Sequence, residues 1–384
     1  MTRWRIPLSD LDLGTEEEAA VVRVIRSGWL TVGEEVAGFE REFAALCGAD
    51  QAVALSSCTA ALHLACVALG VQPGVEVIVP TMTFVATANA VVLAGGSPVF
   101  ADSIGPDDFT VDPADVQRRV GPATRGIICV HYGGFPAQLD DLLELCARHD
   151  LFLIEDVAHA PGAELDGRAL GTFGDAGCFS FYGNKNMTTG EGGMALSGDR
   201  TVAGRIRSLR AHGITTTSWD RFRGRAIEHD VEEAGLNYRP TELAAAVGRA
   251  QLGKLPVNNA SRNALLSRYR EQLASTPGVT MPFAHKSGAA HLAVVVADDP
   301  DRREALRLGL EREGVQTSVH YPPVHLFSRY RAEGHRPGEL PVAETLAERA
   351  LSLPLYASMT SAQVDEVCAL VTGLCASQRS ALPG

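Results

Sequence analysis

The sequence predicts an α/β protein with a large domain, whose mostly parallel sheet is flanked by helices, and a smaller α+β domain at the C-terminus. Between residues 51 and about 180, short apolar runs alternate with longer helix-like stretches, which is the pattern of right-handed βαβ units. The length of 384 residues also exceeds what one hydrophobic core usually covers. Beyond residue 290 a second series of strand-like and helix-like segments follows. We therefore expect a large domain over residues 1–250 and a small domain over residues 251–384.

Local patterns predict the elements of the large domain in order. Thr15 and Glu18 have the spacing of a capping box, which predicts a helix with Val21, Val22 and Ile25 on its apolar face. Short apolar runs predict strands at Gln51–Leu55, Glu76–Val79, Ser97–Ala101, Gly126–Val130, Leu151–Ile154, Gly177–Phe181 and Met194–Ser197. Helical stretches such as Ala60–Leu69 and Gln138–His149 separate them.

The C-terminal third is expected to begin after a long helix. Glu242–Leu255 is typical of a helix that leads out of the large domain. The elements expected beyond it are a strand, a helix, a strand and a helix, at His291–Val296, Arg302–Arg312, Gln316–Val319 and Ser361–Val371. This series suits a small α+β domain.

Composition narrows the class of protein. Hydrophobic residues make up 46% of the chain and charged residues 21%, as in soluble globular proteins. The net charge of −12 argues against binding to nucleic acid or to a membrane surface, because phosphate groups require a basic face. The eight cysteines form no C-x-x-C pair, so we expect reduced core residues and no metal site. No secretory stretch and no run of roughly 18 apolar residues is present, which favours a cytoplasmic protein.

Lys185 is the strongest candidate for a catalytic residue. It follows the apolar run Gly177–Phe181, on a turn rich in glycine and threonine where Glu191 is the only other charged residue. An isolated lysine is usually a solvated surface residue. Burial among small uncharged neighbours would lower the pKa of this amine, which is what an imine-forming lysine requires.

Asp156 is a second candidate. It follows the predicted strand Leu151–Ile154, and ligands of open α/β sheets bind at the carboxyl ends of the strands. An aspartate here could equally cap the next turn. Beside an imine-forming lysine, however, a carboxylate has a specific use, because it keeps the ring nitrogen of pyridoxal phosphate protonated.

A turn that could bind a phosphate is the third candidate element. Small polar residues at Ser56–Thr59 connect the predicted strand Gln51–Leu55 to a helix. The first amides of a helix have no intrahelical acceptor and favour an anion. Many strand-to-helix turns look similar, so this pattern counts only together with Lys185 and Asp156.

Five further motifs occur in order along the chain: GWLTVG at residues 28–33, PTMTFVATANA at 80–90, GLNYRPTEL at 235–243, VHYPPVHL at 319–326 and LSLPLY at 351–356. With them, nearly the whole chain resembles the DegT/DnrJ/EryC1/StrS family of pyridoxal-phosphate-dependent sugar aminotransferases. The resemblance implies the type I fold of these enzymes, which agrees with the architecture predicted above.

The resemblance implies roles around the cofactor ring. Lys185 would hold pyridoxal 5'-phosphate as an internal aldimine and carry a proton between substrate and cofactor, while Asp156 would pair with the ring nitrogen. Phe84 would stack on the ring, although a phenylalanine at such a place is more often a core residue. His159 would bond to the phenolic oxygen where the family commonly has glutamine; a histidine satisfied by local backbone is the alternative.

The resemblance also implies contacts for the phosphate and the substrate. Thr59 and Ala60 would bind the phosphate through backbone amides and Ser180 through its hydroxyl, although Cys58 stands where many relatives have glycine. Asn237 would reach the phosphate in the neighbouring subunit, so that a homodimer would have composite active sites. Candidates for contacts with the sugar or nucleotide are three residues of one proline-bounded loop, which could also form a rigid turn: His320, Tyr321 and His325.

The reaction implied is the amination of a nucleotide-linked keto sugar. The expected substrate is an NDP-4-keto-6-deoxyhexose, preferably dTDP-linked, with glutamate or glutamine as amino donor and pyridoxamine phosphate between the two half-reactions. A 3-keto sugar nucleotide or a keto-inositol of an aminocyclitol pathway remain alternatives. An alternative of another class is a non-catalytic regulator that binds the cofactor, against which the intact Lys185, Asp156 and Ser180 argue.

Overall fold

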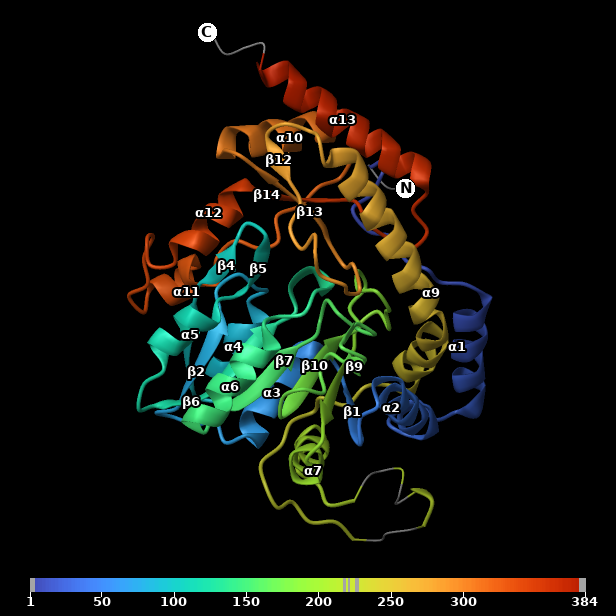
Figure 1. Ribbon diagram of the computed structural model, residues 1–384. Helices are drawn as coiled ribbons and strands as arrows, with labels where there is room; N and C mark the ends of the chain where they lie inside the picture. The colour runs from blue at the N-terminus through green and yellow to red at the C-terminus, as the bar shows by residue number, and fades with distance from the viewer. Residues whose placement is uncertain (1–3, 217–218, 220–221, 225–227, 380–384) are drawn as a thin grey trace.

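In the computed structural model, a seven-stranded sheet forms the centre of the N-terminal part of the chain (Figure 1). The structure describes residues 4–216, 219, 222–224 and 228–379. Across these residues the strand order is β1-β11-β10-β7-β6-β2-β3. The strands are β1 (Gln51–Leu55), β2 (Glu76–Pro80), β3 (Ser97–Ala101), β6 (Thr124–Val130), β7 (Phe152–Asp156), β10 (Ala176–Ser180) and β11 (Gly193–Ser197).

The sheet is mostly parallel. β11 pairs antiparallel with both β10 and β1, whereas β3, β2, β6, β7 and β10 run parallel. Each strand expected in the large domain is present, with bounds that differ by at most two residues. Helices cover both faces, which explains why the strands are nearly continuous apolar runs. The predicted fold class is therefore confirmed.

Two separate cores lie on the two faces of the sheet. Leu153 belongs to one core and Ile154 to the other, because successive residues of a strand point to opposite faces. The helices of the Ile154 face are α3 (Cys58–Ala68), α4 (Ala86–Leu93) and α7 (Arg200–Leu209). The helices of the Leu153 face are α2 (Glu34–Cys47), α5 (Pro113–Arg119), α6 (Leu139–His149) and the first turns of α9.

Helix α9 connects the two parts of the chain and is longer than expected. It runs from Glu242 to Leu273 and passes through Pro256, where the prediction ended it. Packing outweighs the proline signal, since Leu255 is buried in the sheet core and Tyr269 in the C-terminal core. Among the helices of the described ranges, α9 included, none has the length and apolar character needed to cross a bilayer.

The C-terminal part has its own small sheet and core (Figure 1). Its strands are β12 (Val279–Thr280), β13 (Ala293–Ala297) and β14 (Ala350–Leu353), in this order. Helices α10 (Pro300–Arg312), α12 (Pro341–Arg349) and α13 (Ser361–Arg379) pack on it. Ile6 joins this core from the other end of the chain, where it forms a bridge with Val315. The boundary at residue 250 stays a prediction.

The prediction of a strand at Gln316–Val319 is wrong. Only isolated bridges occur here, at Val315 and Ser318, and the third strand of the small sheet is β14. The chain next forms the short helices η2 (Val324–Leu326) and α11 (Ser328–Arg331). The other short elements are the hairpins β4 (Ser103–Gly105) with β5 (Asp108–Val111) and β8 (Glu164–Leu165) with β9 (Arg168–Ala169), and the turn η1 (Tyr132–Gly134).

Helix α1 (Thr15–Ser27) is capped one residue earlier than predicted. Glu17 Oε2 accepts from the Gly14 amide, so the capping box uses Glu17 in place of Glu18. The buried face consists of Glu17, Ala20 and Val24, whereas Val22 and Ile25 are exposed. Two of the three positions predicted for the apolar face, Val22 and Ile25, are therefore wrong, whereas Val21 is half-buried.

Candidate active site

Lys185 lies on the turn between β10 and β11, at the carboxyl end of β10. Its backbone N–H donates to Tyr182 O at 2.9 Å, and the residue is half-buried. Burial lowers the pKa of the amine to about 8, although the negative charge of Asp156 opposes this shift. The pKa of Lys185 is thus shifted in the direction expected from the sequence.

Asp156 is the last residue of β7, and its carboxylate is buried. Oδ2 accepts from Thr87 Oγ1 at 2.9 Å, and Oδ1 accepts from the Ala158 amide at 3.1 Å. Burial raises the pKa of Asp156, even though these hydrogen bonds and the charge of Lys185 favour its ionised form. A cationic partner would therefore stabilise this carboxylate, and a protonated pyridine nitrogen is such a partner.

Helix α3 begins beside this pair. Ser57 is its N-cap, and Ser57 Oγ accepts from the Ala60 amide at 3.1 Å. The first intrahelical bond of the backbone is from Ala61 N to Ser57 O. The amides of Cys58 and Thr59 are therefore the ones that the helix itself leaves for an anion, whereas the Ala60 amide is already capped. This is a departure from the expected pair Thr59 and Ala60.

Close packing brings Ser180 toward the same helix terminus. Ser180 pairs with Gly193 of β11, and a Cβ atom on Gly193 would lie only 2.3 Å from the backbone carbon of Ser57. Position 193 thus requires glycine, because the backbone of β11 approaches the start of α3 so closely there. The buried Ser180 hydroxyl accepts from Tyr182 N at 3.3 Å and keeps its own proton to donate.

Three aromatic residues, Phe84, His159 and Tyr321, lie near one another. Phe84 is 58% exposed, and its ring centroid lies 6.0 Å from that of Tyr321. His159 is buried, with its Nε2 2.9 Å from Tyr321 Oη and its Nδ1 3.3 Å from the Gly133 amide. The structure therefore brings Phe84, His159 and Tyr321 together.

His320 and His325 have different surroundings. His320 Nδ1 lies 2.9 Å from Ser352 Oγ, and burial together with the positive charge of Lys185 lowers the pKa of His320 to about 4. His325 is fully buried, with Nδ1 2.7 Å from Thr81 Oγ1 and Nε2 3.2 Å from Glu344 Oε1. Both nitrogens of His325 are used inside the protein, so the geometry supports a structural role instead of a substrate contact.

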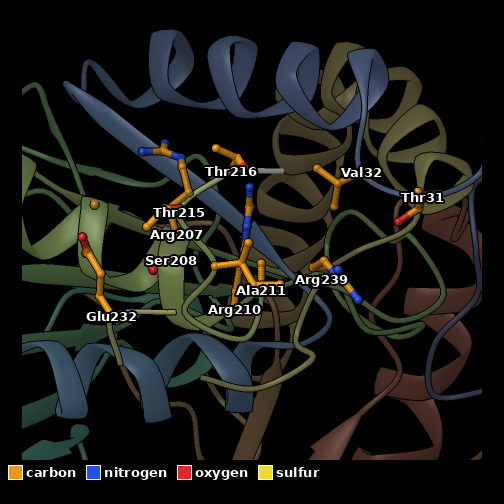
Figure 2. Close-up of a pocket in the computed structure, with 12 residues that line it drawn as sticks. Thr31, Val32, Arg207, Ser208, Arg210, Ala211, Thr215, Thr216, Glu232 and Arg239 are labelled. Carbon is orange, nitrogen blue, oxygen red and sulfur yellow. The ribbon is translucent and has the colours of Figure 1, made fainter. Parts of the chain in front are cut away.

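Asn237 is exposed, and its contacts within the described residues are with Ala211, just after α7, and with Arg239. It forms a bridge with Ala211, and its Oδ1 accepts from Arg239 Nε at 3.0 Å. Arg239 also lines a cavity of about 420 Å³ next to α7, together with Thr31 and Arg207 (Figure 2). Lys185 and Asp156 are not among the described residues that line this cavity, so it is separate from the site.

Three functional neighbours were not singled out from the sequence: Thr87, Asn186 and His291. Thr87 could have been noticed, because it follows Thr83 by four residues, which is the spacing of neighbours on one helix face. Asn186 donates to Asn259 Oδ1 at 2.8 Å and to a backbone carbonyl, and it accepts from His291 Nδ1 at 2.9 Å. Such partners, distant in sequence, have no local signal.

The donor set fits pyridoxal phosphate at three points. The first amides of α3 and the Ser180 hydroxyl offer donors to a phosphate, and the buried Asp156 offers an acceptor to a ring N–H. The amine of Lys185 interacts electrostatically with Asp156 and with Cys58, the first residue of α3, and it is neutral about half of the time near pH 8. The three points meet the needs of the phosphate, the ring nitrogen and the aldehyde.

Comparison with known proteins gives the family. The sequence model of the DegT/DnrJ/EryC1/StrS aminotransferase family matches residues 11–372. The chain is 39% identical to the spore coat polysaccharide biosynthesis protein SpsC of Bacillus subtilis, over 94% of this chain and 95% of that protein.

Two solved structures extend the comparison. DesV from S. venezuelae, solved in complex with a ketimine intermediate, is 38% identical, with a TM-score of 0.90 over 97% of this chain and 98% of that one. DesI, solved in the presence of its TDP-sugar product, is 33% identical, with a TM-score of 0.87 over 98% and 94%. Solved relatives include pyridoxal and pyridoxamine phosphate forms. The chain belongs to the DegT/DnrJ/EryC1/StrS aminotransferase family and is a pyridoxal-phosphate-dependent sugar aminotransferase.

Proposed function

We propose that this enzyme transfers an amino group from glutamate to C4 of an NDP-4-keto-6-deoxyhexose, with dTDP as the preferred carrier. The nucleotide is supported by the likeness to DesI, which was solved with a TDP-sugar product. The matched family is one of aminotransferases, and this argues against the alternative of a non-catalytic regulator.

The observation that carries the proposal is the pair formed by the half-buried Lys185, whose amine has a lowered pKa, and the buried Asp156. Pyridoxal phosphate supplies an aldehyde that condenses with amines and a ring that takes up electrons when a neighbouring carbon loses its proton. With a pKa of about 8, Lys185 can both accept and release a proton at neutral pH, as a general base and acid must. Asp156 would hold a proton on the ring nitrogen by charge pairing.

Other residues would hold the cofactor in place. The first amides of α3, with Thr59 among them, and the Ser180 hydroxyl would bind the phosphate. The exposed ring of Phe84 would cover one face of the pyridine ring and exclude water.

Tyr321 and His320 are proposed to contact the substrate. The Tyr321 ring lies 6.0 Å from that of Phe84 and 5.9 Å from that of His159, and the positive charge of Lys185 acts on His320. Both therefore border the space in front of the lysine. His325 is left out of this set because Thr81 and Glu344 engage both of its ring nitrogens.

The active enzyme is proposed to be a homodimer with composite sites. Asn237 is exposed, and its own described contacts are with Ala211 and Arg239. An exposed amide at this place is available to a second copy of the chain, and a two-fold axis would give two equivalent sites.

A substrate panel tests the proposal. Purified enzyme with pyridoxal phosphate is given glutamate or glutamine and one of several ketones: 4-keto and 3-keto deoxyhexoses linked to dTDP or UDP, and a keto-inositol. Mass spectrometry detects the amino product. The proposal expects the highest kcat/KM for the dTDP-4-keto sugar with glutamate. Faster turnover of a 3-keto sugar or of the keto-inositol would replace it by that alternative.

A further inference from the structure

A hydrogen-bond chain with a fixed direction runs from the backbone of Gly133 to Tyr321. The Gly133 N–H donates to His159 Nδ1 at 3.3 Å, and His159 Nε2 lies 2.9 Å from Tyr321 Oη. Because Nδ1 accepts a hydrogen bond, the single proton of a neutral His159 ring is on Nε2 and is donated to Tyr321. The tyrosine oxygen is then the acceptor, and its own hydrogen remains to be donated elsewhere.

This series of hydrogen bonds requires a neutral His159 ring, and the surroundings of the ring disfavour its protonated form. The ring is buried, and burial together with the positive charge of Lys185 holds the pKa of His159 well below its usual range. His320 is a further basic group nearby and acts in the same direction. His159 is therefore neutral at physiological pH, with one N–H to give.

A second histidine holds the ring plane of His159. The ring of His291 packs against it, with centroids 4.4 Å apart. Both hydrogens of Asn186 Nδ2 are donated, to Asn259 Oδ1 at 2.8 Å and to the Ala289 carbonyl at 2.7 Å. Asn186 Oδ1 must therefore accept from His291 Nδ1, 2.9 Å away, which fixes the orientation of the His291 ring.

Tyr321 carries the remaining hydrogen toward the site. Its ring lies 6.0 Å from that of Phe84 and 5.9 Å from that of His159. Burial and the negative charge of Asp156 raise the pKa of Tyr321, so that the hydroxyl stays protonated. A hydroxyl donor thus borders the space between Phe84 and Asp156, where the proposed function places the cofactor ring.

We propose that Tyr321, and not His159, donates the hydrogen bond to the phenolic oxygen of pyridoxal phosphate, and that His159 is a positioning residue that orients the tyrosine hydroxyl. The inference rests on the proposed placement of the cofactor between Phe84 and Asp156. It replaces the role that the resemblance implied for His159, because the one N–H of this ring is used by Tyr321.

The first test needs no cofactor. Nitrogen-15 NMR of the histidine rings in the apoprotein reports which ring nitrogen of His159 carries the proton, with His159→Gln used to assign the signals. We expect Nε2 to be protonated and Nδ1 to be bare between pH 6 and 8. A proton on Nδ1 would mean that His159 does not donate to Tyr321, and it would overturn the inference.

The second test is a pH titration of the visible absorption band of the bound cofactor. A donor to the phenolic oxygen stabilises the more negative, unprotonated state of the chromophore. Tyr321→Phe is therefore expected to raise the apparent pKa of the band by about one unit, the size of one hydrogen bond to a charged group. His159→Gln can still accept from Gly133 and donate to Tyr321, so it should remain near the wild type, whereas His159→Leu should give a smaller upward shift.

Tyr330→Phe is the matched control, since it removes a buried tyrosine hydroxyl that bonds to Asn89. It should leave the titration unchanged. A full shift in His159→Leu with none in Tyr321→Phe would show that His159 bonds to the cofactor itself, and an unchanged titration in both would also overturn the inference. Failure of the substrate panel with these shifts present would reject the proposed function alone.

Discussion

Thr87 Oγ1 donates a hydrogen bond of 2.9 Å to Asp156 Oδ2, and both side chains are buried. Thr83 Oγ1 lies 2.8 Å from the Thr87 oxygen. Since Thr87 gives its only proton to Asp156, the Thr83 hydroxyl must be the donor to Thr87. Two hydroxyls in series therefore hold one oxygen of the carboxylate, while the Ala158 amide holds the other.

Replacing Thr87 by valine should weaken cofactor binding. The substitution preserves the shape of the side chain and removes the donor, which raises the pKa of Asp156 further and weakens its pairing with a cationic ring. We expect the dissociation constant of pyridoxal phosphate to rise about tenfold, as for the loss of one hydrogen bond to a charged group. Titration of the apoprotein measures it, with the exposed Thr280→Val as control. Equal affinity in the two variants would remove Thr87 from the site.

The reactivity of Lys185 should reveal its lowered pKa. Only the neutral amine is acetylated, so labelling of Lys185 in the apoprotein should rise tenfold per pH unit and level off near pH 8. Partial burial lowers the pKa of Lys254, but the hydrogen bond and charge of Glu17 outweigh it and raise that pKa, so labelling of Lys254 should still increase above pH 10. Peptide mass spectrometry follows both lysines in one sample.

A variant at Asp156 tests whether its charge raises the pKa of Lys185. The carboxylate favours the charged form of Lys185 and therefore raises its pKa. In Asp156→Asn this contribution is lost, so the plateau in Lys185 labelling should begin below pH 8. A plateau that stays in place, or that moves toward higher pH, would show that the two groups do not interact in the way described.

Much of the site could be predicted because its parts follow strands. Asp156 and Lys185 lie at the carboxyl ends of β7 and β10, and an apolar run reveals each strand in the sequence. The extent of α9 could not be read in the same way. Proline at position 256 signals a helix end locally, whereas the packing that keeps the helix intact involves residues far away in sequence.

The hydrogen-bond partners of polar side chains could not be predicted from the sequence either. A histidine in a loop has the same local pattern whether it faces a ligand, as proposed for His320, or lies fully buried between Thr81 and Glu344, as His325 does. Likewise the Ser57 hydroxyl uses the Ala60 amide, which only the folded turn reveals. Pairing within the fold decides which polar groups remain for a ligand.

Glu242 should contribute strongly to stability. This buried carboxylate accepts from the amides of Gly33, Glu35 and Val36, each at 2.9 Å, and so satisfies the first turn of α2 from the start of α9. Glu242→Leu leaves these amides without an acceptor and should lower the free energy of unfolding by about 3 kcal/mol. Glu242→Gln retains one acceptor oxygen and should lose less. Urea unfolding measures both, and the exposed Glu271→Leu serves as control.

Mixing two inactive variants tests the composite site. If Asn237 serves the site of the partner subunit, Lys185→Ala and Asn237→Ala should each be nearly inactive alone. In a mixed dimer one site would then lack both residues, while the other would have both. Random exchange makes half of the dimers mixed, so activity should recover to about one quarter of the wild type. Two lots of Lys185→Ala with different tags are the control for exchange itself. If Asn237 instead acted in its own subunit, each site of a mixed dimer would lack one of the two residues, and mixing would restore nothing.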